Sequence, residues 1–524
     1  YRDGPTDGAS PRGGVRRRRA GRGWHELGKH DANGPNSAGE VADVAHVIPT
    51  GAASTMDNAA LAAMFREFID EHCVVLADES KRPFECDGLS VYKQMPGLVV
   101  MPASTEQVRQ IMRLCFQHKV PVVVRGAGTG LSGGALPHPN GVLLSLARLS
   151  KIVEIDADAG LARVQPGVSN LAISDACAPY GLFYAPDPSS QIACSIGGNV
   201  AENAGGVHCL KYGLTVHNVV QLTVVTVEGE IITVGSDGLT SAGPDLMALM
   251  IGSEGMLGVV TEVTVKLLPE PSHCQVILAS FDELEKAGDA VSAVIAEGII
   301  PAGFEMMDSH AIRAAEDYVG AGYDTDAAAL LLCELDGTEG EVRHCVEQVT
   351  AVFRRYSARS IRVSQNEAER LLFWKGRKSA FPAVGRISPD YYCMDGTIPR
   401  RMLSRVLSEI SRLSGEYGLR VANVFHAGDG NLHPLILFDE SKPGELQKAE
   451  EFGAEILRIC VSAGGCITGE HGVGVEKLAQ MLDQFNDAEL AQLNAIKDAL
   501  DPDALLNPGK GVPTLKRCQE YRST

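Results

Sequence analysis

The stretch Arg125-Gly-Ala-Gly-Thr-Gly-Leu-Ser-Gly-Gly-Ala-Leu-Pro137 decides the fold. It directly follows residues 120–124, Val-Pro-Val-Val-Val, which predict a strand. Gly128, Gly130 and Gly133 match the dinucleotide pattern G-x-G-x-x-G literally. That pattern requires a helix to open within the motif, whereas residues 134–141 contain two glycines, two prolines and an asparagine, which break helices. We therefore exclude a Rossmann fold and expect a loop whose backbone N–H groups surround a pyrophosphate.

A second tract of small residues, 186–206, contains Cys194-Ser-Ile-Gly-Gly-Asn199 and Asn203-Ala-Gly-Gly206. Two tracts of this kind suggest a backbone that encloses a large ligand. Segments rich in β-formers surround them, and residues 259–267, Val-Val-Thr-Glu-Val-Thr-Val-Lys-Leu, are the plainest strand signal. The other expected strands cover residues 141–146, 152–155, 162–165 and 219–227, and a helix is expected at 105–118.

Near residue 270 the pattern changes to strands that alternate with helices. Strands are expected at 276–279, 303–307, 328–335 and 360–363, and helices at 282–297, 309–319 and 340–356. We expect Ser280 or Asp282 to cap the helix at 282–297. This alternation predicts a ferredoxin-like α+β domain. Residues 367–384 look less regular and place Arg377 among aromatic neighbours.

The stretch Val421-Ala-Asn-Val-Phe-His-Ala-Gly-Asp-Gly-Asn-Leu-His-Pro-Leu-Ile-Leu-Phe438 predicts a hairpin with the four-residue loop 428–431. In that register His426 faces His433, and directly opposed residues hold their Cβ atoms roughly 5 Å apart. Two imidazoles at this distance can share one cation, although two strand histidines that merely flank a turn remain the alternative.

The segment Thr468-Gly-Glu-His-Gly-Val-Gly474 places a carboxylate and an imidazole between glycines. Adjacent side chains of an extended segment point to opposite sides. Glu470 can therefore complete a site of two histidines and one carboxylate, while His471 stays free as a base. A glycine-rich surface loop with a solvated Glu-His pair is the alternative. Helices are expected on either side of this loop, at 445–463 and 488–500.

Composition limits the class of protein. The 524 residues are 45% apolar, which predicts two or three domains, and the net charge of −19 argues against a nucleic-acid partner. The 13 cysteines include no Cys-x-x-Cys pair, which indicates a reducing compartment and offers no iron–sulfur framework. No apolar run is long enough to span a membrane. Residues 1–55, rich in Gly and Arg, are expected to be disordered.

With these motifs, the chain resembles flavoproteins that have a p-cresol methylhydroxylase-type FAD domain. Among them it is most similar, over about residues 57–515, to FAD-binding subunits of bacterial glycolate oxidase, also called glycolate dehydrogenase. The likeness is strongest in Phe373-Trp-Lys-Gly-Arg377 and in Tyr391-Tyr-Cys-Met-Asp-Gly-Thr-Ile-Pro-Arg400. It implies an α+β fold with an extension (1–55), an FAD domain (56–269), a ferredoxin-like cap (270–420) and a C-terminal segment (421–524). The C-terminal segment is expected to return to the FAD domain and to carry helices, the metal and the catalytic residues.

The resemblance also implies the cofactors. Some relatives attach the flavin through a histidine in the first loop, but the loop here has Ala127 and Thr129 among its glycines, so we expect noncovalent FAD. His138 lies just outside that loop. The implied FAD-binding residues are Arg125, Gly126, Ala127, Gly128, Thr129, Gly130, Leu131, Ser132, Gly133, Gly134, Cys194, Gly197, Gly198, Asn199, Asn203, Gly205, Val260 and Asn507. A divalent cation, Zn, Mn or Fe, is implied on His426, His433 and Glu470, with His471 as base.

The activity implied is the oxidation of a short 2-hydroxy acid, glycolate before D-lactate, with Arg377 gripping the substrate carboxylate. Phe381 and Cys393 stand where relatives that bind a second carboxylate have Thr and Lys, which predicts a short substrate. The implied partners are an iron–sulfur subunit and a second FAD-domain subunit that pass electrons to quinone, in the cytoplasm or at the inner face of the membrane. The alternatives are a D-lactate or other D-2-hydroxy acid dehydrogenase, a metallohydrolase and an inactive assembly subunit.

Overall fold

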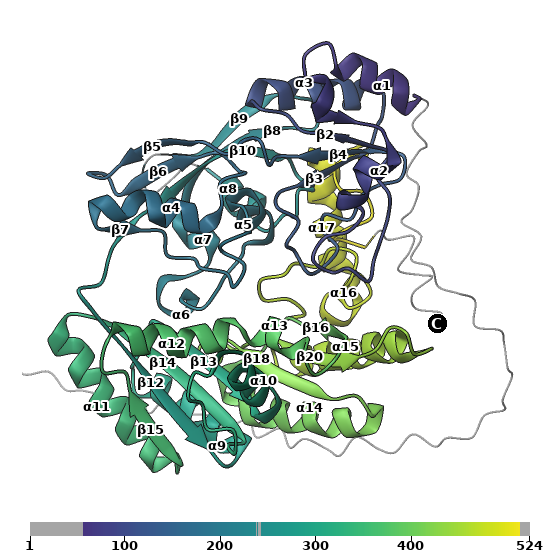
Figure 1. Cartoon of the computed structure of the whole chain (residues 1–524). Coiled ribbons are helices and arrows are strands. Elements are labelled where there is room, and N and C mark those ends of the chain that lie inside the picture. Colours follow the sequence, from purple (N-terminus) through teal and green to yellow (C-terminus); the bar gives the residue numbers. More distant parts are fainter. Residues whose placement is uncertain (1–55, 237, 239–242, 514–524) are drawn as a thin grey trace, which may run out of the picture. The chain divides into compact units, whose positions relative to one another are not determined.

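The computed structural model describes residues 56–236, 238 and 243–513 (Figure 1). The prediction for residues 1–55 lies outside this range. The described chain opens with a four-stranded sheet of order β1-β2-β4-β3, in which β2, β4 and β3 run parallel. Its strands are β1 (Val74–Val75), β2 (Leu98–Val100), β3 (Val122–Arg125) and β4 (Val142–Ser145), and its helices are α1 (Asn58–Phe65), α2 (Asp78–Lys81) and α3 (Thr105–Gln117). Residues 126–141 contain no helix, as the rejection of the Rossmann fold requires.

Helix α3 illustrates how sequence pattern sets packing in this domain. Val108, Ile111, Met112 and Cys115 recur at helical spacing, and all four are buried. The Ser104 hydroxyl accepts a hydrogen bond from the Gln107 N–H and so caps the helix. The expected helix at 105–118 is therefore confirmed.

A second, antiparallel sheet of order β5-β6-β10-β8-β9 follows. The strand expected at 259–267 is its central member, β10 (Val259–Lys266), with Val259, Val263 and Val265 buried. The other strands are β5 (Ile152–Asp156), β6 (Leu161–Val164), β8 (Val219–Val225) and β9 (Ile231–Gly235), and the short elements beside them are α4 (Asn170–Cys177), β7 (Leu182–Phe183), α5 (Ile196–Glu202), α6 (Cys209–Tyr212), α7 (Thr215–Asn218), α8 (Leu246–Met250) and β11 (Leu268–Pro269).

The cap is built on a seven-stranded antiparallel sheet of order β15-β12-β14-β13-β18-β20-β16. Its first four strands in the chain, β12 (His273–Phe281), β13 (Gly303–Asp308), β14 (Ala329–Gly337) and β15 (Ser360–Val363), take the order fourth, first, third, second. This is the ferredoxin-like arrangement, so that prediction is confirmed. The strands β18 (Val421–Phe425), β20 (Pro434–Phe438) and β16 (Asp390–Cys393) extend the sheet. The expected boundary at residue 420 therefore falls inside one hydrogen-bonded sheet.

Alternating side chains of the cap sheet face two separate helix layers. Ile277 and Leu331 pack under one layer, and Val276 and Leu330 under the other. The first layer contains α9 (Leu284–Ala296), α11 (Glu339–Arg355), α14 (Leu403–Tyr417) and α15 (Glu445–Ser462), and the second α10 (Ser309–Val319), α12 (Glu367–Lys378) and α13 (Ala380–Val384).

Two local expectations for the cap were wrong. Residues 367–384, expected to be irregular, form α12 and α13, and the Asn366 side chain caps α12 by accepting the Glu369 N–H. Helix α9 begins after Glu283 without a side-chain cap, so neither Ser280 nor Asp282 has the capping role. Ser280 instead lies buried in β12, where the strand continues to Phe281.

The end of the described chain returns to the first sheet, as expected. The chain passes through α16 (Met481–Gln484) and α17 (Asp487–Leu500) and then reaches Val122 in β3. The Val122 N–H donates to the Leu505 carbonyl, and the Asn507 N–H donates to the Val122 carbonyl. Figure 1 accordingly shows α17, in yellow, beside β3. Two short strands, β17 (Gly396–Thr397) and β19 (Asn431–Leu432), pair near the cap sheet. The chain therefore brings segments about 380 residues apart in sequence into contact, at Val122 and Asn507.

Candidate active site

The two glycine tracts line one cavity of about 350 Å³. A Cβ atom on Gly126 would lie 2.4 Å from Ser195 Oγ, so the absence of a side chain there lets the two tracts touch. Gly128, with φ +74°, adopts a backbone conformation that other residues rarely adopt. The predicted FAD-binding residues that line the cavity are Gly126, Ala127, Gly128, Thr129, Gly130, Leu131, Gly134, Cys194, Gly197, Gly198, Asn199 and Asn507.

The remaining predicted FAD-binding residues do not line the cavity, and three of them form hydrogen bonds beside it. Arg125 donates to the Cys86 carbonyl at 2.7 Å, Ser132 donates to the His471 carbonyl at 2.9 Å, and the Gly205 N–H donates to Glu470 at 3.1 Å. The residues of this group are Arg125, Ser132, Gly133, Asn203, Gly205 and Val260. The Ser132 and Gly205 contacts tie the glycine tracts to the segment that carries Glu470 and His471.

The hairpin expected around residues 421–438 forms, but its register differs from the prediction. His426 pairs with Asn431 rather than with His433, and the loop is 427–430. A shift of two residues keeps every side chain on the same face of the sheet. His433 is therefore a diagonal neighbour of His426, and the two ring centroids lie 5.1 Å apart. The histidines meet as expected through a different pairing.

Glu470 joins the two histidines. Its Oε1 atom lies 3.3 Å from His426 Nε2 and 3.3 Å from His433 Nε2. All three side chains are at least mostly buried, and their ligand atoms lie within 4.8 Å of one another. Two imidazoles and a carboxylate in this arrangement fit a divalent transition-metal ion.

His471 also belongs to this cluster. Its ring stacks on His433 at 5.0 Å, so the expectation that Glu470 and His471 point to opposite sides was wrong. The backbone bends at Gly469, Glu470 and His471, so the segment is not extended. His471 lines the cavity, and its Nδ1 atom has no hydrogen-bond partner among the described residues. Burial lowers the pKa of His471 to about 4, against the opposing effect of Asp395, so the imidazole is neutral at pH 7.

Asp395 holds the segment that carries Glu470 and His471, and sequence reasoning missed it. Its carboxylate accepts the backbone N–H groups of Gly469, Glu470 and His471 at 2.9 to 3.3 Å. The buried Lys477 ammonium lies 3.3 Å from the same carboxylate and balances its charge. Asp395 therefore fixes the segment through its backbone, which leaves both functional side chains free.

Glu305 is a second residue that was missed. It is fully buried in β13, and its Oε1 atom lies 2.7 Å from His426 Nδ1. The other oxygen accepts from Arg377 Nε at 2.8 Å. A carboxylate on Nδ1 orients an imidazole so that its Nε2 atom faces a ligand. In His426 that atom faces Glu470.

Arg377 does not line the cavity. Only 1% of its side chain is exposed, and its guanidinium contacts Glu305. The next residue, Lys378, does line the cavity, with Nζ 3.7 Å from Asp187. Helical geometry explains this exchange, because consecutive residues of α12 point about 100° apart. Phe381 also lines the cavity, whereas Cys393 is buried in the cap core.

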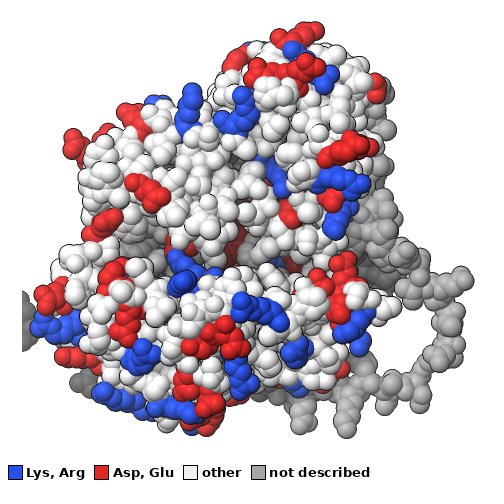
Figure 2. Space-filling view, viewed as in Figure 1, with Lys and Arg blue, Asp and Glu red and all other residues white. Residues whose placement is uncertain are grey.

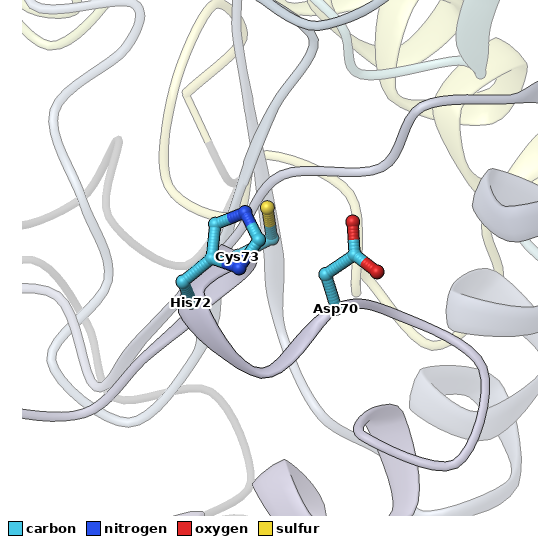
Figure 3. Close-up of side chains that lie close together, drawn as sticks. All are labelled: Asp70, His72 and Cys73. Carbon is cyan, nitrogen blue, oxygen red and sulfur yellow. The ribbon is translucent and has the colours of Figure 1, made fainter.

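A separate group of possible metal ligands, Asp70, His72 and Cys73, lies near the start of the described chain (Figure 3). Arg148 already contacts two of them, with Nη1 2.8 Å from Cys73 Sγ and Nη2 3.5 Å from Asp70. Since a guanidinium takes the place that a cation would need, we assign no function to this group.

Comparison with known proteins defines the class. The family model "FAD binding domain" matches residues 96–235, and "FAD linked oxidases, C-terminal domain" matches residues 270–511. The crystal structure of p-cresol methylhydroxylase with substrate bound has the same fold, with a TM-score of 0.74, 18% identity, and coverage of 88% of this chain and 98% of that one. The chain belongs to the FAD-linked oxidase family and is an FAD-dependent oxidoreductase. The metallohydrolase alternative is therefore not retained.

Two curated relatives narrow the comparison. The glycolate oxidase subunit GlcD of Escherichia coli K12 is 61% identical over 471 residues, which cover 90% of this chain and 94% of that protein. A D-lactate dehydrogenase of Anaerostipes hadrus is 32% identical over 447 residues, 83% of this chain and 94% of that protein. Among the described residues, no helix has both the length and the apolar character that crossing a membrane requires.

Proposed function

We propose that this chain oxidises glycolate to glyoxylate, with D-lactate as a second and poorer substrate. One observation carries the proposal: His433, Glu470 and His471 line the same cavity as both glycine tracts. A substrate bound beside these side chains would lie next to the flavin. The E. coli relative is by name a glycolate oxidase subunit, and the more distant A. hadrus relative is a D-lactate dehydrogenase.

Two groups supply chemistry that side chains lack. A divalent cation, Zn, Mn or Fe, would be held by His426, His433 and Glu470, and a bound cation of this kind lowers the pKa of a coordinated hydroxyl. FAD would be held noncovalently by the glycine tracts and would supply the acceptor for the hydride on C2 of the substrate. Glu305 supports the cation site because it fixes the orientation of His426.

His471 takes the proton of the substrate hydroxyl. Its imidazole is neutral at pH 7, its Nδ1 atom has no partner among the described residues, and it lines the cavity. The hydroxyl proton therefore goes to His471, and with FAD bound as the hydride acceptor the product would be the 2-oxo acid.

Lys378, and not Arg377, binds the substrate carboxylate. It is the ammonium group that lines the cavity, and a 2-hydroxy acid carries a carboxylate for it to bind. Arg377 acts indirectly, since it balances the charge of Glu305, which in turn orients His426. The proposed order of contacts is Arg377 to Glu305 to His426.

Phe381 limits the length of the substrate. Its ring lines the cavity and lies edge-on against Tyr391, with centroids 6.2 Å apart. A second carboxylate at this position would lose its hydration without gaining a polar partner, which costs roughly several kcal/mol. Glycolate and D-lactate avoid this cost.

The electrons that FAD would take up need another carrier. The 13 cysteines contain no Cys-x-x-Cys pair, so we propose an iron–sulfur partner subunit and a second FAD-domain subunit, with quinone as acceptor. The E. coli relative is by name a subunit. We place the assembly in the cytoplasm, at the inner face of the membrane.

On the face shown in Figure 2, acidic and basic side chains are interspersed.

An absorption spectrum followed by anaerobic addition of substrate tests the proposal. Glycolate should bleach the flavin band completely, and D-lactate should bleach it more slowly. A flavin that neither acid reduces would rule out the activity. Elemental analysis tests the cation separately: the wild-type protein should carry about one transition-metal ion per chain, and His426→Ala should lose it. An unchanged metal content in that variant would remove His426 from the site.

A further inference from the structure

Glu202 is a carboxyl group in the cavity for which the proposed mechanism has no use. It is the last residue of α5 and lies within the second glycine tract. The side chain lines the cavity, and its Oε2 atom is shielded from water yet has no hydrogen-bond partner among the described residues. Buried polar atoms almost always have a partner, so a carboxyl group in the wall of a ligand cavity that leaves one oxygen unpaired has a hydrogen bond available for the ligand.

Glu254 lies beside Glu202, but both of its oxygens have hydrogen-bond donors. Its two oxygens accept the N–H groups of Val473 and Gly474, each at 2.7 Å. Both carboxyl groups approach Gly472: a Cβ atom there would lie 2.1 Å from Glu202 Oε2 and 2.9 Å from Glu254 Oε1. Gly472 is therefore required as a glycine, and the two acids are direct neighbours.

Two adjacent carboxyl groups in a buried site oppose each other's ionisation, because like charges repel where water does not screen them, while the ammonium groups of Lys477 and Lys510 act in the other direction. The two backbone N–H donors favour the charged form of Glu254. The Oε2 atom of Glu202 has no such donor among the described residues, so the proton resides on Glu202. The pKa values agree: burial raises both, and the pKa of Glu202 rises well above its usual value, with the charge of Glu254 adding to the effect.

The part of FAD that meets Glu202 follows from the catalytic side chains. His433, Glu470 and His471 line the same cavity, and Gly472 directly follows His471. The isoalloxazine ring must lie where the hydride is transferred, next to these groups. We propose that Glu202 is a neutral carboxylic acid that donates a hydrogen bond to an acceptor atom of the isoalloxazine ring, and that Glu254 keeps it protonated. This inference rests on FAD binding and on the catalytic side chains of the proposed function, but not on the identity of the cation or of the substrate.

The contact should have a redox consequence. Reduction increases the negative charge on the ring, and hydrogen bonds to charged acceptors are roughly twice as strong as neutral ones. Glu202 then stabilises the reduced flavin more than the oxidised flavin and raises its reduction potential. If the difference in stabilisation is tenfold, the two-electron potential changes by about 30 mV.

Variants of the full-length holoprotein separate the possibilities. Glu202→Gln keeps a donor of the same shape but cannot ionise, Glu202→Met and Glu202→Ala have no donor, and Glu228→Met changes an exposed glutamate of the same domain as a control. The dissociation constant of FAD is measured from the fluorescence of FAD released on dilution. The midpoint potential is measured by equilibration with a reference dye.

We expect Glu202→Gln and Glu228→Met to match the wild type in both measurements, to within about threefold in dissociation constant. Both variants without a donor should bind FAD about tenfold more weakly, the usual worth of one hydrogen bond, and have a lower potential. If Glu202→Gln loses FAD as the donor-free variants do, Glu202 acts as an anionic acceptor and the proposal is overturned. If the donor-free variants match the wild type, Glu202 does not contact the flavin, which also overturns it. A preparation that contains no flavin would instead contradict the family assignment.

Discussion

His208 should stabilise the contact between the FAD domain and the cap in a pH-dependent way. Its Nδ1 atom lies 3.0 Å from Asp187 of the FAD domain, and its Nε2 atom lies 3.0 Å from Glu334 of strand β14 in the cap. The side chain of His208 is 23% exposed, and those of the two acids are 12% and 4% exposed. The perturbation is His208→Gln, which keeps hydrogen-bonding capacity but removes the cation between two buried carboxylates.

The direction of this pH dependence follows from the pKa of His208. Burial lowers this pKa, but Asp187 and Glu334 outweigh burial and raise it from 6.5 to about 10 in the folded protein. A folded-state pKa above the unfolded value means that the stabilisation is fully present below about pH 6.5 and is lost as pH rises through about 10. The pKa of Glu334 is lowered to about 2, so this acid stays charged throughout that range.

The loss of stability caused by His208→Gln has an upper limit. A tenfold change in the proton affinity of a group corresponds to about 1.4 kcal/mol, so the rise in the pKa of His208 sets an upper limit of roughly 5 kcal/mol. Removing one partner of a buried ion pair costs about 3–5 kcal/mol, and the partial exposure of His208 reduces this cost. We expect His208→Gln to lower the free energy of unfolding by about 2–3 kcal/mol at pH 6 and by under about 1 kcal/mol at pH 10.5, by the same linkage.

The assay is urea unfolding of both proteins at pH 6 and pH 10.5, followed by circular dichroism. His72→Gln, which replaces an exposed histidine, is the matched control and should match the wild type at both pH values. An equal loss of stability at the two pH values would refute the reasoning, because it would mean that His208 contributes through packing and not through charge.

The remaining predictions concern the active site. His471→Asn should keep FAD and metal bound but slow flavin reduction by glycolate about 10²- to 10⁴-fold in stopped-flow measurements, and a rate within threefold of wild type would exclude His471 as the base. Lys378→Met should raise KM for glycolate about tenfold or more with a smaller change in kcat, whereas an unchanged KM would remove Lys378 from the substrate site. Acid precipitation should leave the yellow colour in the supernatant, since the flavin is noncovalent; colour in the pellet would contradict this. Phe381→Thr with Cys393→Lys should shift relative kcat/KM from glycolate toward 2-hydroxyglutarate, and Phe381→Thr alone should account for most of the shift because only Phe381 lines the cavity.

Sequence reasoning succeeded where the pattern of the residues along the chain contains the whole signal. The helix-breaking residues after Gly133 excluded a Rossmann fold, and the alternation of strands and helices after residue 270 predicted the ferredoxin-like core. It failed where the geometry depends on placing a loop or a side chain to within one residue. The order of glycines and polar residues in 427–431 allows two loop positions, and only the pairing of β18 with β20 selects between them. The choice of Arg377 over Lys378 failed for the same reason, because a step of one residue on a helix turns a side chain from the cavity into the core.

The residues that sequence reasoning missed share a physical origin, and this origin gives a signal that could have found them. Glu305 stands between Phe304 and Met306 in a strand whose six residues are all buried, and Asp395 follows the buried Met394. An ionised carboxylate in such a place costs several kcal/mol unless donors surround it. In this protein the donors are the parts of the site that must be held still: His426 and Arg377 on Glu305, and the backbone N–H groups of residues 469–471 on Asp395. An acid within an apolar strand therefore marks a position where burial is offset by an organised partner. The partner itself cannot be read from the sequence, because the donors lie 72 to 121 residues away in the chain and only the fold brings them together.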